Sequence, residues 1–307
     1  MREANLKATP FVDAHIHLWD LERLRYPWLT PPFSADGVAG SVETIAKTYL
    51  VDEYRADLSN WSLAGAVHVD AGAHPDDALA ETTWLEGMAD ASGLPSGIVA
   101  FAPLNDPQIE RLLERQAAHP RVRGVRHIIN WHPSPAYSYT PRDLLEDPAW
   151  ERGFASLARH RLSFDLQAYP HQFAAIAAIA ARRPDVPVII NHCGMPLMAE
   201  DEGFEQWREG LKRLAALPQT SLKISGFGIV DHAWSVQSIR PYVLEAIAMF
   251  GPERCMFASD VPTDKLYRGV DGILGAYDQI TGGASDDERR ALFGGNANRL
   301  YRLGLVL

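Results

Sequence analysis

The 307-residue sequence predicts an α/β protein, a single-domain (β/α)8 TIM barrel spanning residues 1–307. Two observations predict this fold: short β-rich runs alternate with helical patterns, and eight such runs occur along the chain. Strands that alternate with helices pair in parallel through right-handed crossovers, and eight such units close into a barrel. An open, doubly wound sheet is the alternative. The Gly-rich phosphate turn that usually follows its first strand is replaced here by His15-Ile16-His17.

The expected strands are the short β-rich runs, taken in chain order. They are Phe11–His17, Ala64–Asp70, Gly97–Pro103, Gly124–Asn130, Leu162–Gln167, Pro187–His192, Ser221–Gly226 and Cys255–Asp260. The stretches between them are rich in Ala, Leu and Glu and have helical periodicity. The expected helices are Asp76–Ala91, Asp106–Ala118, Pro148–His160, His171–Arg183, Phe204–Leu217 and Val236–Phe250. No linker separates these elements, which indicates one domain.

Two of the expected loops are unusually long and rich in aromatic residues and proline. One is Leu18–Ser41, after the first strand, and the other is Trp131–Asp147, after the fourth. Both follow the carboxyl ends of strands, which is the face where barrel enzymes bind substrate. Loops of this length in a compact domain usually have a function, such as covering a site.

Composition narrows the class of protein and of partner. A net charge of −10 argues against nucleic-acid binding, which needs basic patches. The polar start and the short apolar runs predict neither a signal peptide nor a membrane span, and two cysteines are too few for a disulfide framework. We therefore expect a cytoplasmic protein that acts on a small molecule. The aromatic loops could equally meet a second copy in a homo-oligomer. Serine-hydrolase, Walker and dinucleotide motifs are absent from the sequence.

The first expected strand ends in a His-x-His pair. Alternation along a strand points residues two apart to the same face, so His15 and His17 are expected to project together. Two neighbouring imidazoles can hold a metal ion or polarise a carbonyl oxygen. A strand packed against helices gains nothing from such a pair, so the pair predicts a chemical role.

Polar side chains also stand at the carboxyl ends of the other expected strands. His192 ends the sixth strand and Asp260 ends the eighth, and both are expected to meet the His-x-His pair at the barrel mouth. Three histidines and a carboxylate are ligands that zinc or manganese prefers. The same set suits metal-free hydrolysis, with Asp260 as general base and imidazoles as donors to an oxyanion. The structural alternatives are a buried core histidine at 192 and a helix N-cap at 260.

Five further residues are candidates for substrate contacts. They are Arg126 and His127 on the fourth strand, Gln167 on the fifth, and Trp19 and Trp28 in the loop after the first. Two interpretations of Arg126 stay open: it forms an ion pair at the barrel mouth, with Asp165 as the candidate partner, or it binds an anionic or hydroxyl-rich substrate. Lys223, on the seventh strand, is interpreted as a buried structural lysine.

Several motifs together resemble a known family. VDAHIHLWD at 12–20, followed by YPWL at 26–29, resembles the amidohydrolase superfamily, specifically its amidohydrolase-2 branch. The resemblance continues through GVRH at 124–127, NHCG at 191–194, KISG at 223–226, FASD at 257–260 and GNANRLY at 295–301. That branch contains sugar-lactone hydrolases and pyrone-dicarboxylate lactonases. The resemblance implies a (β/α)8 barrel and hydrolysis at a carbonyl carbon.

The resemblance also implies roles for single residues. His15 and His17 match the strand-one pair, His192 matches the strand-six histidine, and Asp260 matches the strand-eight base. Many metal-binding members supply a carboxylated lysine or a glutamate from strand four and a histidine from strand five. Here strand four offers Arg126 and His127, and strand five ends in Gln167. We therefore expect either one divalent ion, zinc or manganese, held by His15, His17 and Asp260, with His192 as a further candidate ligand, or a metal-free site.

A lactonase is the function that these observations favour. Water would attack the carbonyl of a sugar lactone or a dicarboxylate-type lactone, with Asp260 as the base, Arg126 as a substrate contact, and Trp19 and Trp28 as pocket walls. One alternative is a metal-dependent decarboxylase of the same superfamily. The other is a non-catalytic barrel that binds a sugar acid.

Overall fold

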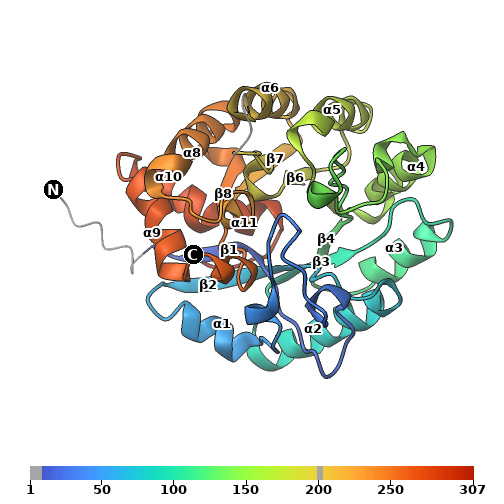
Figure 1. The fold of residues 1–307 in the computed structure, drawn as a ribbon. Coiled ribbons are helices and arrows are strands. Elements are labelled where there is room, and N and C mark those ends of the chain that lie inside the picture. The colour runs from blue at the N-terminus through green and yellow to red at the C-terminus, as the bar shows by residue number, and fades with distance from the viewer. Residues whose placement is uncertain (1–8, 199–202) are drawn as a thin grey trace.

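Eight parallel strands form one sheet, in which each strand pairs with the next along the chain. The computed structural model describes residues 9–198 and 203–307. Its strands are β1 (Phe11–Ile16), β2 (Leu63–Val69), β3 (Gly97–Phe101), β4 (Val122–Arg126), β5 (Ser163–Leu166), β6 (Val188–Ile190), β7 (Thr220–Ile224) and β8 (Cys255–Phe257). Figure 1 looks along the barrel that they form, with the helices arranged around it.

The seam between the first and the last strand nearly closes the barrel. Ile16 forms a parallel bridge with Val261, just beyond β8. The His17 N–H donates to the carbonyl of Val261 at 2.8 Å, and the Asp260 N–H donates to the carbonyl of His15 at 2.9 Å. The backbone hydrogen bonds of this seam therefore join the residues that the sequence singles out for chemistry.

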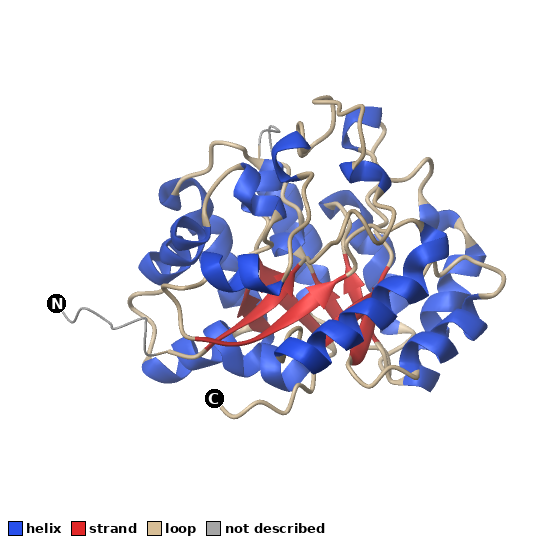
Figure 2. Ribbon diagram, turned by 90° about the horizontal axis from the view of Figure 1, so that it is seen from below, coloured by secondary structure: helices blue, strands red, loops and turns tan. Residues whose placement is uncertain are grey.

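The helices lie outside the sheet, and Figure 2 shows the long loops gathered on one side of it and the C-terminus on the other. Those described are α1 (Val51–Asp57), α2 (Ala78–Ser92), α3 (Ile109–Ala117), α4 (Pro148–Ser156), α5 (Phe173–Ala181), α6 (Gly203–Ala215), α7 (Phe227–Val230), α8 (Val236–Phe250), α9 (Val270–Ile280), α10 (Asp286–Arg290) and α11 (Asn296–Leu300). In the described part of the chain, no helix has the length and hydrophobicity needed to cross a membrane.

The predicted barrel is confirmed, with differences at the ends of elements. Helix α8 has the predicted bounds; it begins after Ser235, whose hydroxyl accepts the N–H of Ser238 at 3.1 Å, as an N-cap does. Strand β4 lies earlier than predicted and ends at Arg126, because the backbone leaves the ladder there. His127 and Asn130 therefore lie beyond the strand. The short helices α1, α7, α10 and α11 carry too few turns to give a periodic signal in the sequence.

One buried polar cluster joins β5, β7 and the segment that follows α11. Lys223 and Asp165 are fully buried, and the Lys223 ammonium contacts Asp165 Oδ1 at 2.5 Å. The Tyr301 hydroxyl donates to the same oxygen at 2.7 Å, and the ammonium lies 5.1 Å from the Tyr301 ring centre. Lys223 is thus a paired, buried lysine, as the sequence suggested. Asp165 pairs with it and not with Arg126, which corrects one interpretation of Arg126.

Breaking this pair should cost more stability than breaking a surface pair. Lys223→Met leaves Asp165 buried without its counterion, and we expect a loss of about 3 kcal/mol in the free energy of unfolding. The matched control is Arg183→Met, because Arg183 pairs with the half-exposed Asp185; here we expect less than about 1 kcal/mol. Urea unfolding followed by circular dichroism measures both. Equal losses in the two variants would contradict a structural role for the Lys223–Asp165 pair.

Candidate active site

Four side chains, carried at the carboxyl ends of three strands, meet at the barrel mouth. His15 and His17 come from the end of β1, His192 follows β6, and Asp260 follows β8. His15 Nε2 and His17 Nε2 lie 3.5 and 3.3 Å from Asp260 Oδ1, and His192 Nδ1 lies 3.9 Å from Asp260 Oδ2. All four residues are buried. The structure therefore brings together the four residues that the sequence predicted as catalytic or metal-binding.

Two of these residues adopt left-handed backbone conformations. The φ angles of His192 and Asp260 are 52° and 56°, in a region that costs a non-glycine residue about 1 kcal/mol or more. The neighbouring Gly226 also has a positive φ, of 69°, and a Cβ there would lie 2.4 Å from His192 Nδ1. A glycine at 226 is therefore what leaves room for the His192 ring. The hydroxyl oxygen of Ser225 lies 3.2 Å from the same nitrogen, His192 Nδ1.

Asp13 holds the seam from behind the site. Its carboxylate accepts the N–H and the hydroxyl of Ser259 at 2.9 and 2.5 Å, and the Tyr54 hydroxyl of α1 at 3.2 Å. Burial raises the pKa of Asp13 to about 6, against the lowering effect of these hydrogen bonds. Asp13 links β1 to the residue before Asp260, so it is a positioning residue that the sequence analysis did not single out. Its place two residues before His15 was the available signal.

His15 and Asp260 are the two residues of the site whose buried polar atoms have no hydrogen-bond partner among the described residues. Among the described residues, neither nitrogen of His15 and neither carboxylate oxygen of Asp260 has a hydrogen bond. Asp260 therefore does not cap a helix with its side chain. The His17 Nδ1–H donates to the carbonyl of Val69 at 2.8 Å, so the lone pair of Nε2 in the neutral ring faces the Asp260 carboxylate. Two acceptors at 3.3 Å call for a cation or a proton between them.

Burial and neighbouring charges set the protonation of the site. Burial lowers the pKa of His192 to about 4, and it lowers that of His15 well below the ordinary value of 6.5. Both rings are therefore neutral at pH 7. Burial opposes ionisation of Asp260, but attraction to His192, His17 and Arg126 holds its pKa below 3.8. The site at neutral pH thus combines a carboxylate with neutral imidazoles, which is the form that binds a divalent cation.

The geometry fits a metal ion. One ligand atom each from His15, His192 and Asp260 all lie within 4.8 Å of one another. His17 is outside this set, although its Nε2 is 3.3 Å from Asp260 Oδ1. Imidazole nitrogens and a carboxylate are the ligands that zinc binds in catalytic sites, and those of His15 and Asp260 have no hydrogen-bond partner among the described residues. The sequence alone could not separate these three residues from His17.

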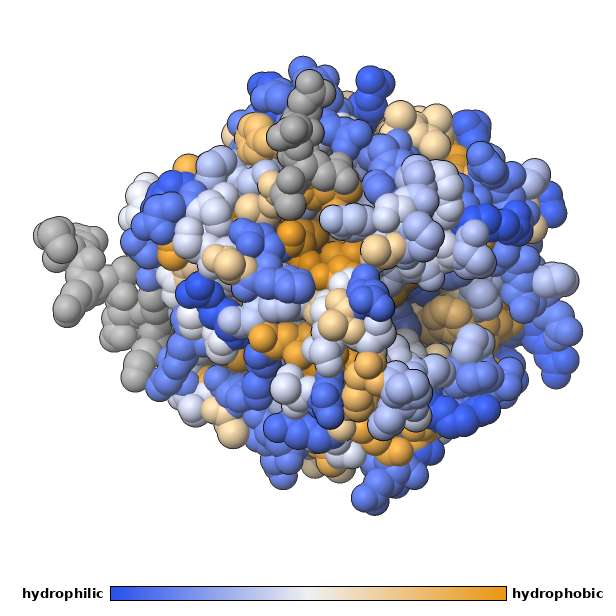
Figure 3. Space-filling view, in the orientation of Figure 1, coloured by the Kyte–Doolittle hydropathy of each residue, from blue (hydrophilic) through white to orange (hydrophobic). Residues whose placement is uncertain are grey.

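A cavity of about 290 Å3 opens beside these residues. Its polar lining side chains are His17, Arg126, Tyr139, Gln167, His192, Asp260 and Thr263, and its other lining residues are Trp28, Ala39, Val42, Ala71, Gly72, Ile128 and Ile229. Figure 3 shows hydrophobic side chains gathered near the centre of the face seen in Figure 1. Tyr139, Ile128 and Ile229 were not predicted from the sequence, because Tyr139 and Ile128 reach the cavity from the segment after β4 and Ile229 reaches it from the short helix α7.

Arg126 is held by two partners at the cavity wall. Its Nε donates to Asp70 Oδ2 at 2.7 Å, one Nη to Gln167 Oε1 at 3.0 Å, and the other Nη to the carbonyl of Asp70. The arginine therefore forms an ion pair, and its partner is Asp70. Gln167 lines the cavity with it.

The other three predicted contact residues lie in different positions. Trp28 lines the cavity, and its indole N–H donates to the carbonyl of Ala71 at 2.8 Å. Trp19 is fully buried behind Trp28, with ring centres 5.4 Å apart, so it supports the wall and does not line it. His127 is not among the described lining residues; its Nδ1 accepts the N–H of Leu104 at 3.1 Å and its ring packs on Phe101. The structure thus places Trp19 and His127 away from direct substrate contact.

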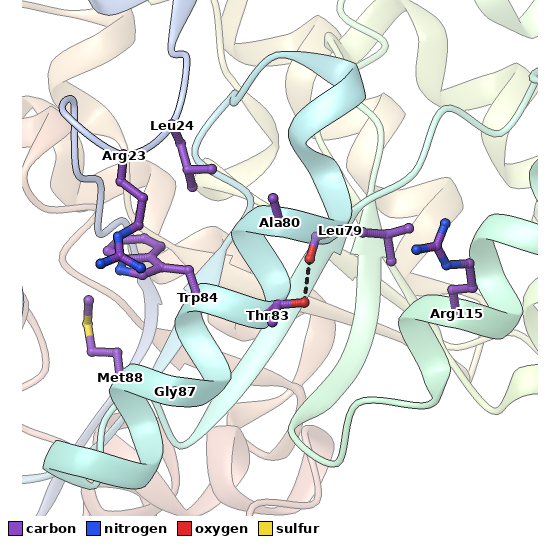
Figure 4. Close-up of a pocket in the computed structure, with 9 residues that line it drawn as sticks. All are labelled: Arg23, Leu24, Leu79, Ala80, Thr83, Trp84, Gly87, Met88 and Arg115. Carbon is purple, nitrogen blue, oxygen red and sulfur yellow. Dashed lines mark hydrogen bonds between the residues drawn. The ribbon is translucent and has the colours of Figure 1, made fainter.

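A second, larger hollow of about 860 Å3 lies outside the barrel, along α2. Figure 4 shows Trp84 and Met88 of α2 beside Arg23 of the β1–α1 loop, with Arg115 of α3 across from them. The Thr83 hydroxyl donates a hydrogen bond of 2.8 Å to the carbonyl of Leu79, one turn earlier in α2. None of the nine described residues that line this hollow is a histidine or a carboxylate. This hollow therefore lacks the histidines and the carboxylate that line the cavity beside Asp260.

Comparison with known proteins identifies the family of this chain. The sequence model of a family described as amidohydrolase matches residues 12–303. The chain belongs to the amidohydrolase family. It is 43% identical to the uncharacterized protein y4mH of Sinorhizobium fredii, over 95% of this chain and 98% of that one. Membership of this family makes the protein an enzyme, as the motifs predicted.

Two proteins of Burkholderia multivorans add to this comparison. The amidohydrolase chain is 28% identical to an L-fucono-1,5-lactonase, over 95% of this chain and 96% of the relative. It also matches the crystal structure of an amidohydrolase with bound zinc, with a TM-score of 0.79 and 28% identity, over 95% of this chain and 99% of that one. The amidohydrolase described above has the same fold, and its His15, His192 and Asp260 form a group that could hold a metal ion.

Adding a methyl group at Gly226 should disturb His192. Gly226→Ala combines a positive φ with a contact of 2.4 Å to the ring, and we expect a loss of about 3 kcal/mol in the free energy of unfolding. The control is Gly93→Ala, which has a φ of 81° but no described atom within 4 Å of the added Cβ. We expect about 1 kcal/mol there. Chemical unfolding of both variants measures the difference, and equal losses would rule out the steric role.

Acid should destabilise the protein through His127. Burial lowers the pKa of this histidine from 6.5 to about 4, so between these values the unfolded chain binds the proton and the folded one does not. Stability is therefore lost as the pH falls from 6.5 towards 4, by up to about 3 kcal/mol for this residue. In His127→Asn, which keeps an acceptor for Leu104, the loss should be smaller by that amount. Unfolding at pH 7 and pH 4 tests this, and identical acid losses would contradict it.

Proposed function

We propose that this enzyme hydrolyses a lactone, with Asp260 as the base that activates water. The observation that carries the proposal is the unpartnered Asp260 carboxylate, which faces a cavity beside three histidines. The likeness to an L-fucono-1,5-lactonase supports a lactone as the substrate class. A strained cyclic ester needs less activation than an amide, which suits a site with one carboxylate and a few donors.

Asp260 would act twice in the reaction. Because attraction to its neighbours holds its pKa below 3.8, it is ionised at neutral pH and can take a proton from water as the water attacks the ring carbonyl carbon. The attack forms a tetrahedral oxyanion. When that intermediate collapses, the bond from the carbonyl carbon to the ring oxygen breaks. Asp260 then returns its proton to the departing oxygen, which leaves a hydroxy acid.

The histidines would stabilise the oxyanion and orient the carboxylate. His15 and His192 are neutral at pH 7, so each ring has one N–H that can donate to a developing negative charge. His17 is oriented by its hydrogen bond to Val69. Gln167 and Arg126, at the opposite wall, hold each other in place and offer polar contact to the ring substituents.

The same residues fit a divalent metal ion. His15, His192 and Asp260 would hold zinc or manganese, with His17 beside them, and the ion when bound would polarise the lactone carbonyl. The zinc in the related structure from Burkholderia multivorans supports zinc as the first ion to test. The protein's own contribution is the buried donor set, in which His15 and Asp260 have no hydrogen-bond partner among the described residues.

A pH-indicator assay over a panel of sugar and aromatic-pathway lactones tests this function. Chelator-treated enzyme is assayed alone, with zinc and with manganese. We expect turnover that Asp260→Asn lowers by at least about a thousandfold, with an unchanged circular dichroism spectrum. The surface variant Asp185→Asn is the control and should keep full activity.

The outcomes of this assay separate the roles of the site residues. Turnover without added metal would assign the chemistry to Asp260 and the histidines directly. Turnover that depends on added metal would make them ligands as well. An Asp260→Asn variant that keeps most of its activity would overturn the mechanism, and failure to turn over any lactone would overturn the proposed function.

A further inference from the structure

The cavity beside Asp260 offers an incoming ligand little unpaired positive charge. Resting on the proposed lactone hydrolysis, we propose that the site takes an uncharged lactone with an apolar face. We further propose that Asp70, which does not line the cavity, sets this preference by neutralising Arg126.

The contacts of Arg126 show why it is a poor anion receptor. Each of its three nitrogens already donates one hydrogen bond: Nε to the Asp70 carboxylate at 2.7 Å, one Nη to Gln167 at 3.0 Å, and the other Nη to the Asp70 carbonyl. These bonds use three of the five N–H groups of the guanidinium and pair its charge with Asp70. The side chains of Arg126 and Asp70 are only 5% and 3% exposed, so water weakens this pair little. A substrate carboxylate could bind Arg126 only by displacing Asp70 or by sharing the guanidinium with it.

The balance of charge around the cavity points the same way. Of the described lining residues, Arg126 and Asp260 are the ones with a formal charge when histidines are neutral. Asp70 behind Arg126 adds a second carboxylate, so two negative groups face one guanidinium. Without a bound metal ion, a carboxylate that entered would lose its hydration and gain no unpaired cation of the protein, which is unfavourable in a buried site.

The remaining wall favours an apolar edge on the ligand. Trp28, Val42, Ile128 and Ile229 line it with apolar side chains. The indole N–H of Trp28 is already used by the carbonyl of Ala71, so Trp28 presents its ring surface and not its donor. With a volume of about 290 Å3, the cavity is at the small end for ligand sites, which suits a single ring with few substituents.

Matched lactones test the preference for an uncharged ligand. D-glucono-1,4-lactone and D-glucaro-1,4-lactone differ by a hydroxymethyl group against a carboxylate, and the galactonate and galactarate lactones form a second pair. We expect the neutral member of each pair to have a kcat/KM at least about tenfold higher. A pair that is not turned over is compared by its inhibition constants against a lactone that is.

The variant Asp70→Asn tests the role of Asp70. Asparagine keeps an acceptor for Arg126 but removes the negative charge, so the preference for the neutral member should fall by about tenfold or more. The readout is a ratio within one protein, so a general loss of activity cancels. If Asp70→Asn does not fold, Ile128→Lys adds a cation to the cavity with the pair intact and should shift the ratio in the same direction. Ile128→Met is its uncharged control and should leave the ratio unchanged.

The possible failures of the two proposals differ. Equal or faster turnover of the carboxylate lactones by the wild-type enzyme would overturn the inference while lactone hydrolysis stands. An unchanged ratio in folded Asp70→Asn would overturn the role of Asp70. Failure to turn over or bind any lactone would count against the proposed function itself.

Discussion

The seam between β1 and β8 is the constraint on which the site depends. Two backbone hydrogen bonds cross it, and they involve His15, His17 and Asp260 themselves. The buried Asp13 fastens it from behind by accepting two hydrogen bonds from Ser259. Closure of the barrel and assembly of the histidine–carboxylate cluster are therefore one event. The contact between the first and the last strand of the barrel is what brings the residues of the site together.

The barrel mouth separates two kinds of polar group. Around Asp260, nitrogen and oxygen atoms lack partners among the described residues, so they are available to an ion, water or substrate. In the opposite wall, each nitrogen of Arg126 donates a hydrogen bond to Asp70 or Gln167. Buried polar groups without partners are costly and are kept where chemistry needs them, whereas satisfied ones give the wall its shape. Reactivity and shape thus come from different residues of one cavity.

The sequence predicted the fold and the four clustered residues because both leave strong local signals. Alternating strands and helices, and a His-x-His pair at a strand end, can be read without distances. The partners of Arg126 and Asp165 could not be predicted, because strand register and barrel curvature decide which side chains meet. Tyr139 and Ile229 could not be predicted for a related reason: the conformation of the long loop after β4 and the placement of the short helix α7 bring them to the cavity. Trp19 and Trp28 look alike in sequence, yet only packing shows which one faces the ligand.

The seam also determines when the site can exist during synthesis. Asp13 and Ser259, which fasten it, are 246 residues apart in the chain. On a ribosome, the first strand emerges long before the eighth. His15 and His17 are therefore synthesised well before Asp260, the carboxylate beside which they lie in the folded protein. Contacts of such large sequence separation form slowly and late. No partly made chain can therefore hydrolyse substrate or hold an ion with the complete set, and activity begins only when the last strand is in place.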